Sequence, residues 1–376
     1  MNIKTPIKVL SAFILGSTLL SSVAKAEDVI KIGVATSQSG DFAQYGLPSL
    51  EAAKIVADEL NAKGGILGKK VVIIPGDDQC KPELATNVAT KMASEKVNAV
   101  IGHICSGATK AALPIYTKEK IIVISSAATS VDLTQSGEYP YFLRTIPPDD
   151  LQSKIAVDLV ENQLKAKKIA IIHDKGDYGK NYVKFAKDFI EADKKASVVL
   201  FEGITPGQVD YSAIIKKVKN SGADALIFGG YHPEASKIVM QMKSKGLDIP
   251  FISSESIRTE TFIKLAGKNS EGVYAAGTID NSNLELYKKA DADMKRVYNK
   301  QPGNFYFEAY AAMLALANAF ETAGTTDPDK VLEVLRTKKT ATPLGEIIFD
   351  QKGDLVGGGF QMYQVKNAKY VPISSK

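Results

Sequence analysis

Residues 29–35, Val29-Ile-Lys-Ile-Gly-Val-Ala35, form a short apolar run that predicts a buried β-strand. The amphipathic stretch Ser49–Leu60 follows and predicts a helix, which Lys63-Gly64-Gly65 would close. A second short apolar strand is expected at Val71–Ile74. Strand, helix and strand in this order predict the βαβ unit of a parallel sheet, because the helix returns the chain so that both strands run the same way.

The same alternation continues along most of the chain, and it restarts after Pro147-Pro148. The full mature length exceeds a usual single core, so we expect an α/β fold of two Rossmann-like lobes with parallel sheets. Further strands are expected at 99–102, 121–124, 168–173, 198–201, 225–228 and 249–252, helices at 82–94, 107–118, 309–320 and 327–335, and extended ends at 346–349 and 360–365.

The last part of the chain has too few strands to form a lobe alone. We therefore expect it to complete the first lobe and then the second, with hinge linkers near 144–148, 276–280 and 350–355. On this prediction the first lobe holds residues 27–146 and 279–350, and the second holds 147–278 and 351–376. The two lobes would enclose a cleft, and ligands of open parallel sheets bind beyond the carboxyl ends of the strands.

Residues 1–26 read as a cleavable signal peptide. Lys4 and Lys8 precede the apolar stretch Val9–Val23, and Ala24-Lys25-Ala26 supplies small residues for the peptidase. The alternative is an uncleaved anchor, although the stretch is shorter than the roughly 20 residues of a membrane-spanning helix. Neither cysteine lies at the cleavage point, so we expect no lipid anchor and place the mature protein in the periplasm.

The charge and the arginine content argue against a nucleic-acid partner, and the cysteine content suggests a disulfide. Cleavage would remove three lysines and no acid, so the formal charge would fall from +5 to +2. The chain has four arginines, the residue best suited to phosphate and base edges, and we expect no nucleic-acid partner. An even count of two cysteines in an exported chain suggests a disulfide, which would stabilise the fold by roughly 3–4 kcal/mol.

The sequence does not favour an enzyme. It contains no Walker P-loop, no G-x-S-x-G elbow, and no H-E-x-x-H or paired C-x-x-C zinc pattern. A hydrolase with Ser106 and His173 as its pair stays an alternative, but no carboxylate is evidently placed to orient the imidazole. We predict no catalytic residue, no metal and no cofactor.

Loops after the predicted strands carry the candidate binding residues. Ser106 opens a helix after one strand, where it would help hold an anion or act simply as the helix N-cap. Ala127 and Thr129 follow another strand and would bind a ligand or form a turn. Glu255 is the acid best placed to meet an ammonium, with a solvated loop acid as the alternative. Aromatic side chains that could wall a pocket are Tyr45, Tyr178, Tyr231 and Phe305.

Several runs together resemble one family. In order they are Ala43-Gln-Tyr-Gly46, Asn61-Ala-Lys-Gly-Gly-Ile66, Asp77-Asp78 with Cys80, Ile101-Gly-His-Ile-Cys-Ser106, Ala127-Ala-Thr129, Ile171-Ile-His-Asp-Lys175, Gly229-Gly-Tyr-His-Pro-Glu234 and Lys352-Gly-Asp-Leu355. From about Glu27 to residue 365 the chain resembles the periplasmic leucine/isoleucine/valine-binding proteins of ABC transport, which have the type I periplasmic binding protein fold. The resemblance implies capture of leucine, isoleucine or valine for a membrane permease, and we expect a monomer.

The resemblance also implies a role for each site residue. Ser106 and Thr129 should bind the ligand's α-carboxylate. The Ala127 carbonyl, the Thr129 hydroxyl and Glu255 should receive its α-ammonium, and Cys80 and Cys105 should form the disulfide. Around the ligand's side chain it places Tyr45, Ile104, Cys105, Tyr178, Tyr231 and Phe305.

Two questions stay open at this level. Phe305 is followed by Tyr306 and Phe307, and any of the three could face the ligand. The ligand could also be an aromatic amino acid or a short amide, and amide-responsive sensor proteins share the architecture. The signal peptide argues against a cytoplasmic sensor.

Overall fold

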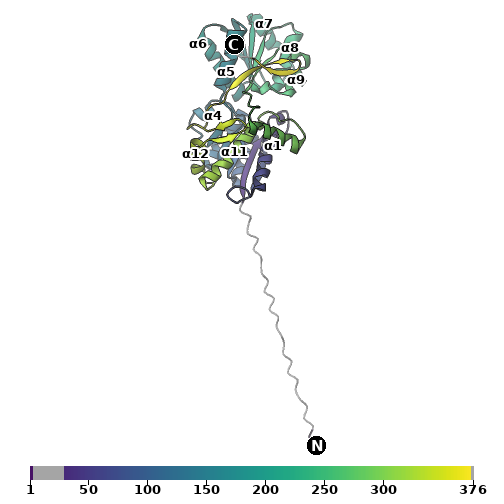
Figure 1. Ribbon diagram of the computed structural model, residues 1–376. Helices are drawn as coiled ribbons and strands as arrows, with labels where there is room; N and C mark the ends of the chain where they lie inside the picture. Colours follow the sequence, from purple (N-terminus) through teal and green to yellow (C-terminus); the bar gives the residue numbers. More distant parts are fainter. Residues whose placement is uncertain (3–28, 374–376) are drawn as a thin grey trace.

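A computed structural model describes residues 1–2 and 29–373 (Figure 1). Residues 3–26 of the predicted signal peptide, with its cleavage point, lie outside the described residues. Two lobes lie one above the other in Figure 1, and each is built around its own sheet with helices on both faces. Within the described ranges, no helix has the length and apolarity needed to cross a bilayer.

The first lobe contains a five-stranded parallel sheet in the order β2-β1-β3-β4-β5. Its strands are β1 Ile30–Thr36, β2 Val71–Asp77, β3 Ala99–Gly102, β4 Ile122–Ser125 and β5 Phe142–Arg144. The helices packed around it are α1 Ala43–Ala62, α2 Pro82–Ser94, α3 Ser106–Lys118, α10 Glu285–Tyr298, α11 Tyr306–Ala323 and α12 Pro328–Thr337, with the short α4 Asp132–Gln135. Buried alanines of α11, such as Ala309 and Ala312, let this helix pack closely on the sheet and on α1.

The second lobe contains a seven-stranded sheet in the order β14-β13-β10-β9-β8-β6-β7. Five strands are parallel, β13 pairs antiparallel with β10, and β14 pairs antiparallel with β13. The strands are β6 Lys168–His173, β7 Ser197–Gly203, β8 Ala225–Gly229, β9 Phe251–Ser253, β10 Tyr274–Thr278, β13 Phe360–Lys366 and β14 Lys369–Pro372. The helices are α5 Asp149–Asp158, continued by a π-turn at Leu159–Gln163, α6 Asp177–Asp193, α7 Ser212–Ser221, α8 His232–Ser244 and α9 Glu260–Ala266, with 3-10 turns at Glu255–Ile257 and Gly267–Ser270.

The chain passes between the sheets three times, after β5, after β10 and after the hairpin β11 Thr340–Thr342 and β12 Gly345–Ile347. Two of the expected linkers overlap strands, because β5 ends at Arg144 and β10 continues to Thr278. The two crossings therefore begin at Thr145 and Ile279, inside the expected ranges 144–148 and 276–280. The domain limits at 146/147, 278/279 and 350/351 stay a prediction.

A buried arginine holds two of these crossings together. Arg144, at the end of β5, donates from Nε to the carboxylate of Asp354 over 2.6 Å. Its other nitrogens donate to the carbonyls of Ala128 and Ser130 and to the hydroxyl of Thr134. A fully buried guanidinium is tolerated here because each of these groups satisfies it. Arg144 thus fixes the loop after β4 that carries Ala127 and Thr129.

Candidate functional site

The carboxyl ends of the two sheets face each other, and the predicted site residues meet there. A small cavity between the lobes is lined by eight of the ten residues predicted to bind ligand, namely Tyr45, Ile104, Ser106, Ala127, Tyr178, Tyr231, Glu255 and Phe305, together with Ser256. The other two, Cys105 and Thr129, are buried in the loops behind this lining. Residues more than two hundred positions apart in the chain thus share one cavity, because the strand ends bring their loops together.

Ser106 is the first residue of α3, and Cys105 occupies the cap position before it. The N-cap alternative for Ser106 is therefore wrong by one residue. Its hydroxyl oxygen instead accepts the backbone N–H of Ser130 over 3.3 Å, which joins the helix start to the loop after β4. The N–H groups in the first turn of a 13-residue helix have no acceptor within the helix, so this end of the cavity offers neutral donors to an anion.

Hydrogen bonds of the Ser125 side chain fix the backbone of the loop after β4. The Ser125 hydroxyl donates to the His103 carbonyl and accepts the N–H groups of Ala127 and Ala128. Together with Arg144, this arrangement holds the backbone beneath the cavity. The hydroxyl oxygen of Thr129 is buried and has no hydrogen-bond partner in the structure.

Glu255 begins the 3-10 turn after β9 and lies opposite Ser106 in the cavity. It is only 5% exposed, so the alternative of a solvated loop acid is wrong. Its Oε1 accepts the Tyr178 hydroxyl over 2.9 Å, whereas Oε2 is buried without a partner. Burial, and next to it the charge of Asp149, raises the pKa of Glu255 to about 8.

Aromatic rings wall the rest of the cavity. The ring of Tyr231 lies 5.1 Å from that of Tyr178 and 6.2 Å from that of Tyr45, and Phe305 lies 5.9 Å from Tyr45. The neighbours of Phe305 turn elsewhere: Tyr306 is buried and donates to the Ala290 carbonyl, and Phe307 stacks on Tyr287. Of the three consecutive aromatic residues, Phe305 is the one that faces this cavity.

The helix that carries Tyr178 lies close to the end of β8. A Cβ atom on Gly229 would approach the Gly179 carbonyl oxygen to 2.2 Å, so only glycine allows the start of α6 to pack against this strand end. Because of this contact, Tyr178 can place its hydroxyl beside Glu255.

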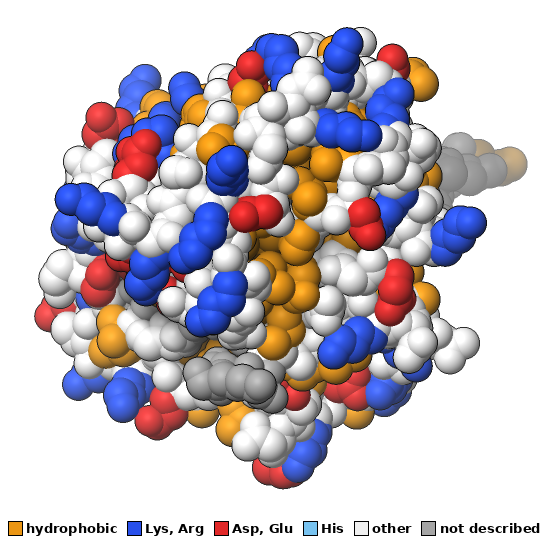
Figure 2. Space-filling view, turned by 90° about the horizontal axis from the view of Figure 1, so that it is seen from above, with side chains coloured by type: hydrophobic (Ala, Val, Ile, Leu, Met, Phe, Trp, Pro, Cys, Tyr) orange, Lys and Arg blue, Asp and Glu red, His pale blue; other side chains and the backbone are white. Residues whose placement is uncertain are grey.

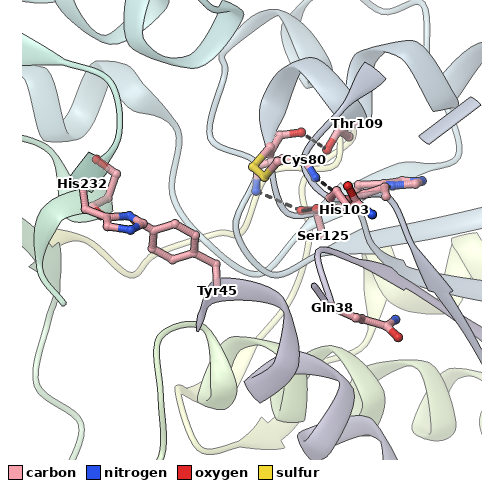
Figure 3. Close-up of a disulfide and its surroundings, with 12 residues drawn as sticks. Gln38, Tyr45, Cys80, His103, Thr109, Ser125 and His232 are labelled. Atoms are coloured by element: carbon pink, nitrogen blue, oxygen red, sulfur yellow. Dashed lines mark hydrogen bonds and ion pairs between the residues drawn. A yellow bond between two sulfur atoms is a disulfide. The ribbon is translucent and has the colours of Figure 1, made fainter. Parts of the chain in front are cut away.

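The cavity is closed by direct contacts between the lobes. The Tyr45 hydroxyl, from α1, donates to the Ser256 carbonyl over 2.5 Å and lies 2.7 Å from Nδ1 of His232 in α8. Figure 3 shows the Tyr45 and His232 side chains reaching toward each other from the two lobes. In this arrangement the free space for the centre of a water-sized sphere is only about 10 Å³, roughly enough for one water molecule. A larger ligand therefore needs the lobes or the lining side chains to move apart.

A larger cavity of about 350 Å³ adjoins the first and shares Glu255 and Phe305 with it. Its lining includes Arg258, whose guanidinium lies over the Tyr363 ring, and the buried Glu308. The small cavity therefore opens into a larger and more polar cavity that also lies between the lobes.

The disulfide Cys80–Cys105 is present, and it joins the loop after β2 to the start of α3. Asp78 accepts the Cys80 N–H over 2.8 Å and lies 2.5 Å from Nδ1 of His103. Figure 3 shows Cys80 and His103 in the surroundings of the disulfide. His103 and His173, the histidines at the ends of β3 and β6, thus both have partners within the protein. Nδ1 of His173 accepts the Lys175 N–H. No hydrogen bond joins Ser106 to His173 within residues 29–373, so the hydrolase pair is not assembled.

Sequence reasoning missed four residues that shape the site, Gln44, Asp149, Gln152 and His232. Gln44 and His232 meet across the lobes, and Gln152 links Asp149 to Glu255. An Asp-Asp pair directly after two prolines was the one signal that could have indicated Asp149, because it predicts a helix start at the hinge.

Comparisons with known proteins agree on one group. The family model described as periplasmic binding protein matches residues 29–369. A leucine-, isoleucine-, valine-, threonine- and alanine-binding protein of Pseudomonas aeruginosa is 36% identical over 346 residues, which cover 92% of each chain. The Leu/Ile/Val-binding protein of Escherichia coli K12 is 34% identical over 343 residues, which cover 91% of this chain and 92% of that one.

Solved structures show the same similarity. The substrate-binding protein LivJ of a branched-chain amino acid transporter from Streptococcus pneumoniae, in complex with isoleucine, is 29% identical with a TM-score of 0.81, and the match covers 92% of this chain and 100% of that one. The leucine-binding protein LivK of Thermotoga maritima has a TM-score of 0.84 at 24% identity, with 92% and 98% covered, and supports the fold.

Proposed function

This chain belongs to the periplasmic binding protein family, and from that premise we propose that it captures leucine, isoleucine or valine for the permease of an ABC importer. The observation that carries the proposal is the polarity of the cavity. Neutral donors at the start of α3 face a single lining carboxylate, Glu255, and aromatic rings fill the space between them. These are the groups that a zwitterion with an apolar side chain needs.

Each part of the ligand has a partner in this arrangement. The carboxylate meets Ser106 and Thr129, and the ammonium meets the Ala127 carbonyl, the Thr129 hydroxyl and Glu255. The orphan hydroxyl of Thr129 and the orphan Oε2 of Glu255 would then be satisfied, which matters because an unpaired buried polar group is costly. Burial of the aliphatic side chain against Tyr45, Tyr178, Tyr231, Phe305, Ile104 and Cys105 adds roughly 1.5–3 kcal/mol.

Closure of the lobes couples binding to transport. Ser106, Thr129 and Tyr45 belong to the first lobe, and Glu255 and Tyr178 to the second, so the full set of partners exists only when the cleft is shut. The ligand therefore stabilises the closed form by its higher affinity for it. The permease then recognises that closed shape. The protein works as an exported monomer in the periplasm, released there by removal of residues 1–26.

A calorimetric screen of the twenty amino acids against the purified mature protein tests the proposal. Leucine, isoleucine and valine should bind with micromolar affinity or tighter, about −8 kcal/mol or beyond. If only aromatic amino acids or short amides bind, the ligand class is wrong. If none of these ligands binds, the transport function falls.

A further inference from the structure

Four buried side-chain oxygens near the cavity have no hydrogen-bond partner. They are Thr129 Oγ1, Asp149 Oδ2, the Tyr182 hydroxyl and Glu255 Oε2. The Thr129 hydroxyl nevertheless lies close enough to the Asp149 carboxylate to lower its pKa, so these two groups are neighbours. Thr129, Asp149 and Tyr182 are 0% exposed, so water does not reach them from the surface. A buried polar atom without a partner costs free energy. Four such oxygens together indicate that hydrogen-bond donors are missing here, which a bound ligand or a protonated carboxyl would provide.

The hydrogen bonds place these four residues together. The amide of Gln152 donates to Asp149 Oδ1 over 2.7 Å, and its carbonyl oxygen accepts the backbone N–H of Glu255 over 3.2 Å. The backbone N–H of Asp149 donates to the Thr129 carbonyl over 2.9 Å. The Ser153 hydroxyl, next to Gln152, donates to the Tyr182 carbonyl over 2.7 Å, and burial, followed by the charges of Glu255 and Asp149, raises the pKa of Tyr182.

Two carboxylates in one dry space cannot both carry a charge cheaply. Burial raises the pKa of Asp149 to about 7, and burial followed by the charge of Asp149 raises that of Glu255 to about 8. Asp149, Gln152 and Glu255 all lie on elements packed with the second sheet, so their contacts survive when the lobes part.

The groups around the pair supply little positive charge. Tyr45, Tyr178, Tyr182 and Tyr231 surround it, and burial raises the pKa of each, so all four are neutral near pH 7. Arg144 acts on Asp149 but is bonded to Asp354. Asp150 adds a further negative charge, and Arg258 lies in the adjoining cavity. In residues 29–373, no ion pair reaches Asp149 or Glu255.

We propose that Asp149 is a second ammonium ligand, and that Asp149 and Glu255 share a proton in the empty cleft which the ligand's ammonium displaces into solvent. This inference rests on the proposed function. The three N–H bonds of the ammonium would go to Thr129 Oγ1, Asp149 Oδ2 and Glu255 Oε2, so that Asp149 takes the place that the proposed function gives to the Ala127 carbonyl. No bond of the ligand breaks, and a buffer base in the solvent accepts the proton that Asp149 and Glu255 had shared.

The ligand-free protein gives the first test. Carbon-13 NMR of the side-chain carboxyls should show one group that titrates above pH 6, about two units above an ordinary acid. Asp149→Asn or Glu255→Gln should return the remaining partner toward lower pH, whereas Asp158→Asn, at the last position of the same helix, should leave the high titration in place. If every carboxyl titrates below about pH 5, the shared proton is excluded.

Calorimetry with leucine gives the second test. At pH 7, titrations in two buffers of different ionisation enthalpy should report about half to one proton released per leucine bound, and the binding constant should rise by up to about tenfold per pH unit from pH 5 to 7. Asp149→Asn should weaken binding and flatten this slope, while Asp158→Asn keeps it. Leucine binding without proton release would overturn the inference and leave the transport function intact.

The two tests separate the possible failures. If leucine does not bind at all, the proposed function falls, yet the carboxyl titration still decides whether the pair holds a proton. If Asp149→Asn does not fold, the wild-type titration and the wild-type proton release decide the matter without it.

Discussion

The hydroxyl oxygen of Tyr45 lies 2.7 Å from Nδ1 of His232, and the two residues belong to different lobes. The single hydroxyl proton of Tyr45 goes to the Ser256 carbonyl, so Nδ1–H of His232 donates to the tyrosine oxygen. The Gln44 amide nitrogen lies 2.8 Å from Nε2 and 2.9 Å from Nδ1 of the same imidazole. These contacts join α1 of the first lobe to α8 of the second across the mouth of the closed cleft.

Removal of the Tyr45 hydroxyl should loosen the closed form. Tyr45→Phe keeps the ring in the wall but leaves the Ser256 carbonyl and His232 without their partner, so leucine affinity should fall by about 1–3 kcal/mol. Calorimetry measures the loss. Tyr298→Phe, on α10 of the same lobe, is the control and should bind normally. Unchanged affinity in Tyr45→Phe would show that these hydrogen bonds do not hold the lobes together.

Acid should remove the stabilising effect of His232. Burial lowers its pKa to about 4, against about 6.5 in an unfolded chain. Below pH 6.5 the unfolded state therefore binds a proton that the folded state does not, and stability falls with falling pH. The stability difference between wild type and His232→Asn should shrink by about 1.6 kcal/mol from pH 6.5 to pH 5. Urea unfolding at both pH values measures it, and a constant difference would contradict the burial of a neutral imidazole.

Loss of the Glu255 carboxylate should weaken binding most. Glu255→Ala leaves the ligand's ammonium without its main counter-charge in a buried site, which costs about 3–5 kcal/mol. Glu260→Ala, at an exposed acid five residues further on, is the matched control. Calorimetry with leucine decides the matter, and equal affinities for the two variants would remove Glu255 from the binding site.

Tyr178 should discriminate by ligand size. Tyr178→Ala removes part of the aromatic wall, so leucine binding should weaken more than alanine binding, because only the larger side chain loses its contact area. Tyr178→Phe keeps the wall and removes only the hydrogen bond to Glu255, so it should affect both ligands alike. Equal losses for leucine and alanine in Tyr178→Ala would argue against a wall role.

Several elements were predictable because their signal is local. The run Lys168–His173 is a strand with the predicted ends, and Pro82–Ser94 is a helix with the predicted ends. Two elements that were missed contain few large apolar residues. In β10, Tyr274–Thr278, small residues replace branched ones, and α10, Glu285–Tyr298, buries only Ala290, Asp293 and Met294. A segment that is stabilised mainly by tertiary contacts is difficult to predict from its own residues.

The sequence alone determined the alternation of strands and helices over most of the chain, and the loops at the strand ends, because hydrophobic periodicity and turn residues act over a few neighbouring positions. The resemblance to the family then identified the loop residues that should line the cleft. Only the tertiary structure decided that Glu255 is buried rather than solvated, and that it shares Gln152 with Asp149. The ionisation of a carboxyl depends on what packs around it, and here those groups come from positions about one hundred residues away in the chain.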